Sequence, residues 1–179
     1  MTFKTFVNGL NIIPVDAIIM PVMIKDGEIY YPDGATEIVD AFTIAPHAKL
    51  RNFVNNSSNL SQGDTFIVPV GRTAYKKFGK SPSYSQIMFY IDLGQGSPQT
   101  MIADIRKKAM LKDITNFALP LIRCHEPFCV DQTDIVKIMI DEFKPFATIL
   151  NISIVVDVSQ HDAYKAFTDA GYNTNSPLL

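Results

Sequence analysis

Apolar and polar positions follow two different rhythms along this chain of 179 residues. Short, nearly continuous apolar runs are typical of strands that are buried on both faces. Between them lie segments whose apolar residues recur every three or four positions, the spacing of one helical face. The pattern predicts strands at 2–7, 15–22, 64–70, 86–93, 116–122 and 148–158, and helices at 36–45, 100–111, 131–143 and 160–170.

This order of elements predicts an α/β fold. Strands separated by helices need crossover connections, which join parallel strands. We expect a three-layer α/β/α sandwich with a mixed, mostly parallel sheet. The length favours a single domain, placed at 1–172, followed by a polar, flexible tail at 173–179. Ligands of such sheets bind beyond the carboxyl ends of the strands, so the segments after residues 22, 122 and 157 are where a site is expected.

Composition narrows the classes of partner. Hydrophobic residues make up 47% of the chain and charged residues 19%, which excludes intrinsic disorder. The formal net charge of −2 provides no basic field, so a nucleic-acid partner is not expected. No apolar run is long enough to span a bilayer, so no membrane association is expected either. Two cysteines are too few for a disulfide scaffold, which favours a reducing, cytoplasmic location.

Reactive side chains are densest at 124–129, where the sequence reads Cys-His-Glu-Pro-Phe-Cys. The spacing of these thiols and this imidazole matches no zinc motif. A thiol nucleophile needs a base placed against it, and the sequence assigns none. We therefore predict no metal, no cofactor and no catalytic residue. An enzyme that uses Cys124 or Cys129 as nucleophile, or a hydrolase that acts through Glu37, remains the third hypothesis.

Several strings resemble the macro domain, a family best known for binding ADP-ribose. The residues Val-Asp-Ala-Ile-Ile at 15–19 are similar to the buried second strand of that family. The string Asn-Phe-Ala-Leu-Pro-Leu-Ile at 116–122 is similar to the strand that leads into its second phosphate loop. Because the order of elements also fits over nearly the whole chain, the resemblance implies the macro-domain fold.

The ligand-contacting positions depart from the family pattern. Two asparagines that bind the distal ribose in the family correspond to Met20 and Met23 here, and methionine offers no amide. The second loop corresponds to 123–129, which has no glycine and contains Pro127, a residue without an N–H. Each lost buried hydrogen bond costs about 1–3 kcal/mol. The usual hydrolase activity is therefore not expected.

The resemblance implies a binding module for a nucleotide-like, ADP-ribose-related small ligand. Tyr31 or Phe128 would stack a base and Arg123 would pair with a phosphate. The alternative is a non-enzymatic interaction or assembly protein, with a protein partner or a second copy of the chain, whose cleft is filled by tyrosines and methionines. The predicted ligand-binding residues are Met23, Tyr31, Gly34, Arg123, Cys124, His125 and Phe128.

Overall fold

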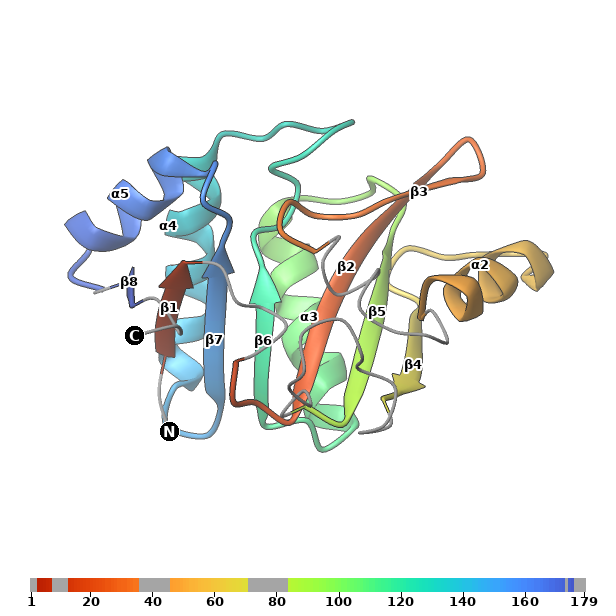
Figure 1. Cartoon of the computed structure of the whole chain (residues 1–179), viewed down its shortest axis with the longest axis horizontal. Helices are drawn as coiled ribbons and strands as arrows, with labels where there is room; N and C mark the ends of the chain where they lie inside the picture. Colours follow the sequence, from red (N-terminus) through yellow and green to blue (C-terminus); the bar gives the residue numbers. More distant parts are fainter. Residues whose placement is uncertain (1–2, 8–12, 36–45, 71–83, 173, 176–179) are drawn as a thin grey trace, which may run out of the picture.

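From β5 (Gln86–Asp92) onward strands and helices alternate along the chain, as the sequence pattern predicts (Figure 1). The structure is a computed structural model, and it describes residues 3–7, 13–35, 46–70, 84–172 and 174–175. The strands are β1 (Phe3–Val7), β2 (Ala17–Lys25), β3 (Glu28–Tyr30), β4 (Thr65–Pro69), β5 (Gln86–Asp92), β6 (Asn116–Pro120), β7 (Asn151–Val156) and β8 (Thr174–Asn175). The helices are α2 (Pro46–Asn56), α3 (Pro98–Leu111), α4 (Gln132–Phe143) and α5 (His161–Asp169), with a 3-10 turn, η2 (Lys144–Phe146).

One mixed sheet of eight strands forms the centre of the molecule. Its order is β4-β5-β2-β6-β7-β1-β8, and β3 pairs with β2 outside this path. The pairs from β5 through to β8 are all parallel, whereas β4 is antiparallel to β5 and β3 is antiparallel to β2. The predicted mixed, mostly parallel sheet is confirmed.

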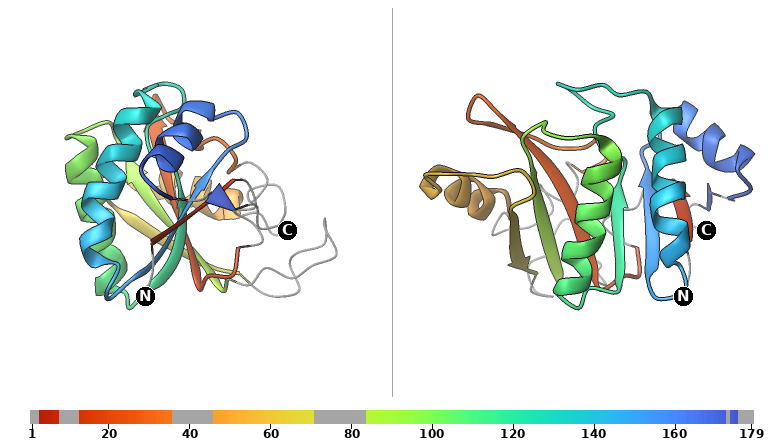
Figure 2. Two further views of the ribbon diagram at one scale, coloured as in Figure 1. Left: turned by 90° about the vertical axis from the view of Figure 1, so that its left-hand side faces the viewer. Right: turned by 180° about the vertical axis from the view of Figure 1, so that it is seen from behind.

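Helices cover both faces of this sheet (Figure 2). The side chains of α3, α4 and α5 pack with one face into the larger hydrophobic cluster. On the opposite face, Leu50 of α2 belongs to the second cluster. Strand β2 serves both, because Ala17 and Ile19 belong to the first cluster while Ile18 and Met20 belong to the second. A strand buried on both faces needs apolar residues at every position, which explains its continuous apolar run.

Local signals set several element ends. The Ser97 hydroxyl accepts a hydrogen bond from the Thr100 N–H at 3.2 Å and caps α3, and the Asp131 carboxylate accepts one from the Asp134 N–H at 3.1 Å and caps α4. The predicted helices 100–111, 131–143 and 160–170 therefore match α3, α4 and α5 to within about two residues. The predicted helix 36–45 lies outside the described residues. Of the predicted tail, the described pair Thr174–Asn175 forms β8 against β1.

The parallel strands bring three loops to one end of the sheet. The loop 93–97 joins β5 to α3, the loop 121–131 joins β6 to α4, and the loop 157–160 joins β7 to α5. All three lie at the top of the molecule in Figure 1, the end toward which the β2–β3 hairpin also projects. No helix in the described part of the chain is both long and apolar enough to cross a membrane.

Candidate functional site

The loops at this end are joined by a buried ion pair between Arg123 and Asp92. The Arg123 Nε donates to Asp92 Oδ2 at 2.9 Å, and its Nη2 donates to Asp92 Oδ1 at 2.8 Å. Arg123 is 5% exposed and Asp92 is 3% exposed. Two parallel hydrogen bonds between a guanidinium and a carboxylate fix both distance and orientation. The pair therefore holds the end of β5 against the loop that follows β6.

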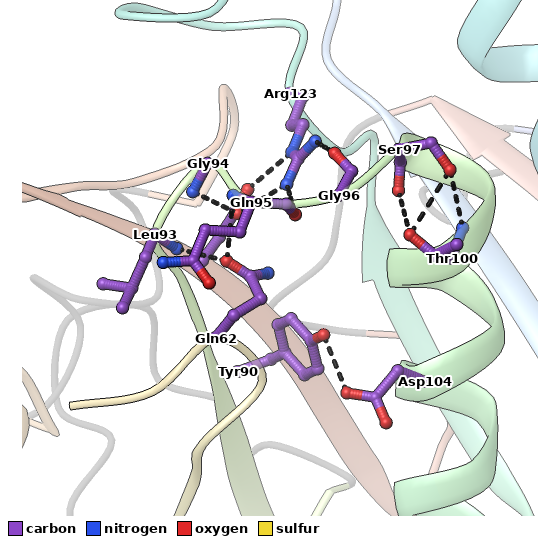
Figure 3. Close-up of polar contacts among 11 residues, drawn as sticks. Gln62, Tyr90, Leu93, Gly94, Gln95, Gly96, Ser97, Thr100, Asp104 and Arg123 are labelled. Atoms are coloured by element: carbon purple, nitrogen blue, oxygen red, sulfur yellow. Dashed lines mark hydrogen bonds and ion pairs between the residues drawn. The ribbon is translucent and has the colours of Figure 1, made fainter.

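The same guanidinium also binds the loop between β5 and α3 (Figure 3). Its Nη1 donates to the Gly96 carbonyl at 2.8 Å, and its Nη2 donates to the Gln95 carbonyl at 2.9 Å. A guanidinium has five N–H donors. Four hydrogen bonds to this chain leave Arg123 with little capacity to bind a phosphate.

Gln62 holds the same loop from the other side. Its Oε1 accepts hydrogen bonds from the Leu93 N–H at 2.7 Å and from the Gln95 N–H at 3.3 Å. The Asp92 Oδ1 accepts a further one from the Gly94 N–H at 2.9 Å. Side chains from three segments thus fix one short loop, which makes it a rigid wall of the candidate site.

Phe128 lies across this loop with part of its ring in solvent. Gly94 has φ +78°, and a Cβ built on it would collide with the Phe128 ring. The Arg123 guanidinium carbon lies 5.3 Å from the centre of the same ring. Because the Phe128 side chain keeps 38% of its surface exposed, it offers an aromatic face at the sheet end.

Several backbone N–H groups of the loop after β6 donate to carbonyl groups of the same loop. The Val130 N–H donates to the Arg123 carbonyl at 2.8 Å and closes the loop. The N–H groups of Phe128 and Cys129 both donate to the His125 carbonyl, at 3.0 and 3.2 Å. Pro127 has no N–H. The second half of the loop therefore lacks the free backbone donors with which a loop cradles a diphosphate.

Cys124 and His125 are poorly prepared for catalysis. Burial, followed by the negative charges of Asp131 and Asp33, raises the pKa of the Cys124 thiol to about 12. Burial also lowers the pKa of His125, although Asp33 and Asp92 act in the opposite direction. Both ring nitrogens of His125 are buried and have no hydrogen-bond partner among the described residues. Neither an activated thiolate nor a base hydrogen-bonded to it is present in this pair.

A third group of polar side chains comes from the loops after β3 and β7. Gly34 has φ +76°, and a Cβ built on it would lie 3.1 Å from Asp157 Oδ1. The Gln160 Nε2 lies 3.5 Å from Asp33 Oδ2, while its Oε1 accepts from the Asp157 N–H at 2.9 Å. Carboxylates thus come close to the His125 loop, and they give this part of the site negative charge.

Tyr31 occupies the side of the site nearest α2, and Met23 lies in β2 beside Asp92 of β5. The Tyr31 hydroxyl and the His47 Nδ1 are 2.6 Å apart, and burial raises the pKa of Tyr31. The Arg51 Nε donates to His47 Nε2 at 3.4 Å. Met23 is 3% exposed and pairs with Asp92 across β2 and β5. Tyr31 is therefore held by its hydroxyl with its ring only partly buried, whereas Met23 is enclosed within the sheet.

Comparisons with known proteins identify the architecture. No family model and no curated protein matches the sequence. Solved structures do match. One is the macro domain of ganglioside induced differentiation associated protein 2, with 9% sequence identity and a TM-score of 0.65. The alignment covers 96% of this chain and 84% of that macro domain. The chain has the macrodomain fold. The macrodomain of Mycobacterium tuberculosis DarG matches with 10% identity and a TM-score of 0.61. That alignment covers 86% of this chain and 97% of the DarG macrodomain.

A third macrodomain, from Trypanosoma brucei and in complex with ADP, matches at 11% identity and TM-score 0.61. The alignment covers 95% of this chain and 69% of the Trypanosoma brucei chain. On this macrodomain fold, Met20 and Met23 stand where the resemblance implies ribose-binding asparagines, and both are fully enclosed in the core. The structure thus places apolar side chains at these two positions.

The seven predicted site residues divide into three groups on the macrodomain fold. Arg123 and Phe128 contact one another, and Cys124 and His125 follow Arg123 in the same loop. Gly34 lies opposite this loop, beside Asp157. Tyr31 and Met23 lie toward α2 and β5. Met23 lies near the end of β2 and four of the others follow β6, whereas Tyr31 and Gly34 follow the antiparallel strand β3.

Four residues of the site were not selected from the sequence: Asp33, Asp92, Asp157 and Gln160. The carboxylates all follow apolar segments, but nothing in their spacing distinguishes them from helix caps and solvated residues. Asp92 gives the best signal, because it ends a strand of six buried residues and a buried carboxylate requires donors. Within the described ranges, no three His, Cys, Asp or Glu residues are grouped so as to hold a metal ion.

Proposed function

We propose that this chain binds a nucleotide-like, ADP-ribose-related small ligand at the carboxyl end of its sheet. The observation that carries the proposal is the meeting of three loops at the strand ends of a macrodomain fold. Solved structures with this fold contain ADP in the Trypanosoma brucei protein and ADPR in a mutant of the Oceanobacillus iheyensis protein. Open α/β sheets bind ligands at this place.

The aromatic side chains supply the proposed base contacts. Phe128 presents a half-exposed ring beside Gly94, and Tyr31 presents a ring whose hydroxyl is fixed by His47. Rings held in this way stack on a base without losing much further freedom. In this proposal Arg123 is a positioning residue, because its guanidinium holds the loop 93–97 on which the Phe128 ring rests.

The charge of the site favours the nucleoside part of the ligand over its phosphates. Arg123 is neutralised by Asp92, and the N–H groups of Phe128 and Cys129 are bound within their loop. Asp33 and Asp157 add negative charge nearby. We therefore expect ADP-ribose to bind more weakly than the fold alone suggests, and adenosine to keep much of its affinity.

Hydrolysis of the ligand is not part of the proposal. The raised pKa of Cys124, and the ring of His125 without a hydrogen-bond partner in the described part of the chain, support a binding role rather than catalysis. Incubation of the chain with ADP-ribosylated protein should release no more ADP-ribose than a buffer control. Release that depends on Glu37 or on either cysteine would contradict this part.

Calorimetric titration with adenosine, ADP and ADP-ribose tests the proposed ligand. Phe128→Ala should weaken adenosine binding about tenfold, whereas Tyr164→Ala, which removes an exposed ring on α5, should leave it unchanged. Asp33→Asn should strengthen ADP-ribose binding about two- to fivefold by removing a nearby negative charge. Asp113→Asn removes the same charge after α3 and serves as its control. Absence of heat with all three ligands would overturn the proposal.

An interaction or assembly role is the second candidate, and a different observation favours it. Met110 and Leu111 at the end of α3 are 40% and 74% exposed. Large apolar side chains that lie together on a surface are typical of a protein contact. This role needs no ligand, so an adenosine titration and a binding assay on α3 report on the two candidates separately.

A further inference from the structure

Helix α3 has apolar side chains on two of its faces. Ile102, Ile105 and Ala109 are buried against the sheet. Ala103, Met110 and Leu111 lie on the outer face, where Arg106 and Lys107 stand between them. They line a surface groove of about 830 Å³ together with Phe146 of η2 and these polar neighbours. A surface helix usually turns a polar face to solvent. We name this hollow the α3 groove; helix α3, which lines it, faces the viewer in the right-hand panel of Figure 2.

One wall of the α3 groove is rigid. The Arg106 guanidinium carbon lies 3.7 Å from the centre of the Phe146 ring. Arg106 also donates to the main-chain carbonyl of Glu142 and lies 3.3 Å from its carboxylate. Phe146 is therefore clamped in place by a stacked cation, and the shape of the groove is preorganised for an occupant.

The rim of the α3 groove is basic although the chain carries a net charge of −2. Asp104 and Arg106 also line the groove, but each is neutralised in an ion pair, with Lys108 and Glu142 respectively. Lys107 lines the groove as well, Lys112 follows the lining residue Leu111, and Lys144 begins η2. All three are exposed, and none belongs to an ion pair among the described residues. Such a rim attracts an occupant of opposite charge.

We propose that the α3 groove binds an acidic, amphipathic peptide segment of a partner protein. Leucine-like side chains of the segment would bury Met110 and Leu111, and its carboxylates would pair with the rim lysines. Grooves of this kind hold the apolar face of a short helix or strand. The site lies on the outer face of α3 and is independent of the proposed nucleotide-like ligand.

The charge and the shape of the groove select this occupant over two others. A two-fold dimer through this face would place the lysines of one copy against those of its partner, because such an interface uses the same patch twice. A flat anionic bilayer would contact the rim but would not fill a hollow of about 830 Å³. A segment inserted into the groove uses both the rim and the apolar floor.

Peptide display tests the proposal with a library of random 14-residue peptides selected on the whole chain. We expect the selected peptides to be enriched in Asp and Glu alternating with Leu, Ile or Phe. Fluorescence anisotropy with one labelled peptide should then show at least a tenfold loss of affinity for Leu111→Ser and for Lys107→Glu. Lys49→Glu, the same charge reversal on exposed α2, should change affinity less than twofold.

The remaining outcomes each count against the proposal. Equal losses with Lys49→Glu would mean binding by overall charge alone, and no enrichment would mean that the groove takes no such peptide. Light scattering that shows a dimer dissolved by Leu111→Ser would assign the surface to a second copy. Binding to phosphatidylserine vesicles that needs Leu111 would assign it to a membrane. Thermal melting of each variant confirms that these exposed positions can change without unfolding the chain.

Discussion

Arg123 closes the gap between two loops by holding Asp92, a residue 31 positions earlier in the chain, with two hydrogen bonds of 2.9 and 2.8 Å. Arg123 does so with φ +51°, a left-handed backbone conformation that is unusual for any residue with a side chain. A strained backbone persists where surrounding contacts determine it. Its four hydrogen bonds are what hold Arg123 in place here.

Removal of either partner should destabilise the fold strongly. Arg123→Met and Asp92→Leu each leave a buried charge uncompensated, so each should lower the free energy of unfolding by about 3–5 kcal/mol. The double variant removes both charges and should recover a large part of this loss. Urea denaturation of the four proteins gives the coupling energy. Strictly additive losses would show that the pair is not an interacting unit.

Gly94→Ala should cost more stability than Gly27→Ala. Both glycines have nearly the same backbone, φ +78° and +79°, so the penalty for a left-handed alanine is about 1–2 kcal/mol in each. Only at Gly94 would the new Cβ also collide with the Phe128 ring, whereas nothing lies within 4 Å of it at Gly27. We expect a further loss of about 1–3 kcal/mol at Gly94.

Thermal unfolding of the two glycine variants measures this difference. Phe128→Ala in the Gly94→Ala background should remove the extra loss, because the collision no longer exists. Equal costs at Gly27 and Gly94 would mean that Phe128 does not rest on the loop. The Phe128 ring would then not lie where the proposed base contact requires it.

The regular elements could be predicted because their signals are local. The run of apolar residues in β2 and the Asp131 cap of α4 each depend on a few neighbouring positions. The hairpin to β3 had a signal of the same kind that the prediction missed. Asp26 and Gly27 both have positive φ, which is the two-residue turn that an Asp-Gly pair favours between antiparallel strands.

The site depends on pairings that the sequence does not show. Arg123 follows a strand that leads toward a ligand site, so a phosphate contact was the natural interpretation. In the structure the guanidinium instead donates hydrogen bonds to the Asp92 carboxylate and to two loop carbonyls. Contacts between residues so far apart arise from the order of strands in the sheet, and spacing along the chain carries no information about it.

Cys129 should react with iodoacetamide well before Cys124. Desolvation and Glu126 also raise the pKa of Cys129, but this thiol is exposed to the reagent, whereas Cys124 is partly buried and burial, Asp131 and Asp33 raise its pKa to about 12. The thiolate is the reactive form, so Cys124 should stay unmodified at pH 8 until the chain unfolds. Mass spectrometry of the digested protein locates the label. Rapid labelling of Cys124 in the folded chain would revive the hypothesis of a thiol nucleophile.

Acidification should destabilise the fold through His125. Burial lowers the pKa of this imidazole below its ordinary value of about 6.5, so below that pH the unfolded chain binds a proton that the folded chain does not. Stability from this group is complete above about pH 6.5 and is lost as the pH falls, at up to about 1.4 kcal/mol per pH unit. His125→Leu also removes two ring nitrogens that have no hydrogen-bond partner among the described residues.

Urea denaturation of the wild-type chain and of His125→Leu between pH 8 and pH 5 measures this dependence. The variant should lose less stability across the range, because its side chain binds no proton in either state. At pH 5 it should therefore be the more stable protein. His161→Gln, which removes an exposed imidazole at the start of α5, controls for the loss of a histidine as such. If the wild-type and His125→Leu curves stay parallel from pH 8 to pH 5, His125 is not the buried neutral group that the structure shows, and the loop 123–130 must be open enough to hydrate it.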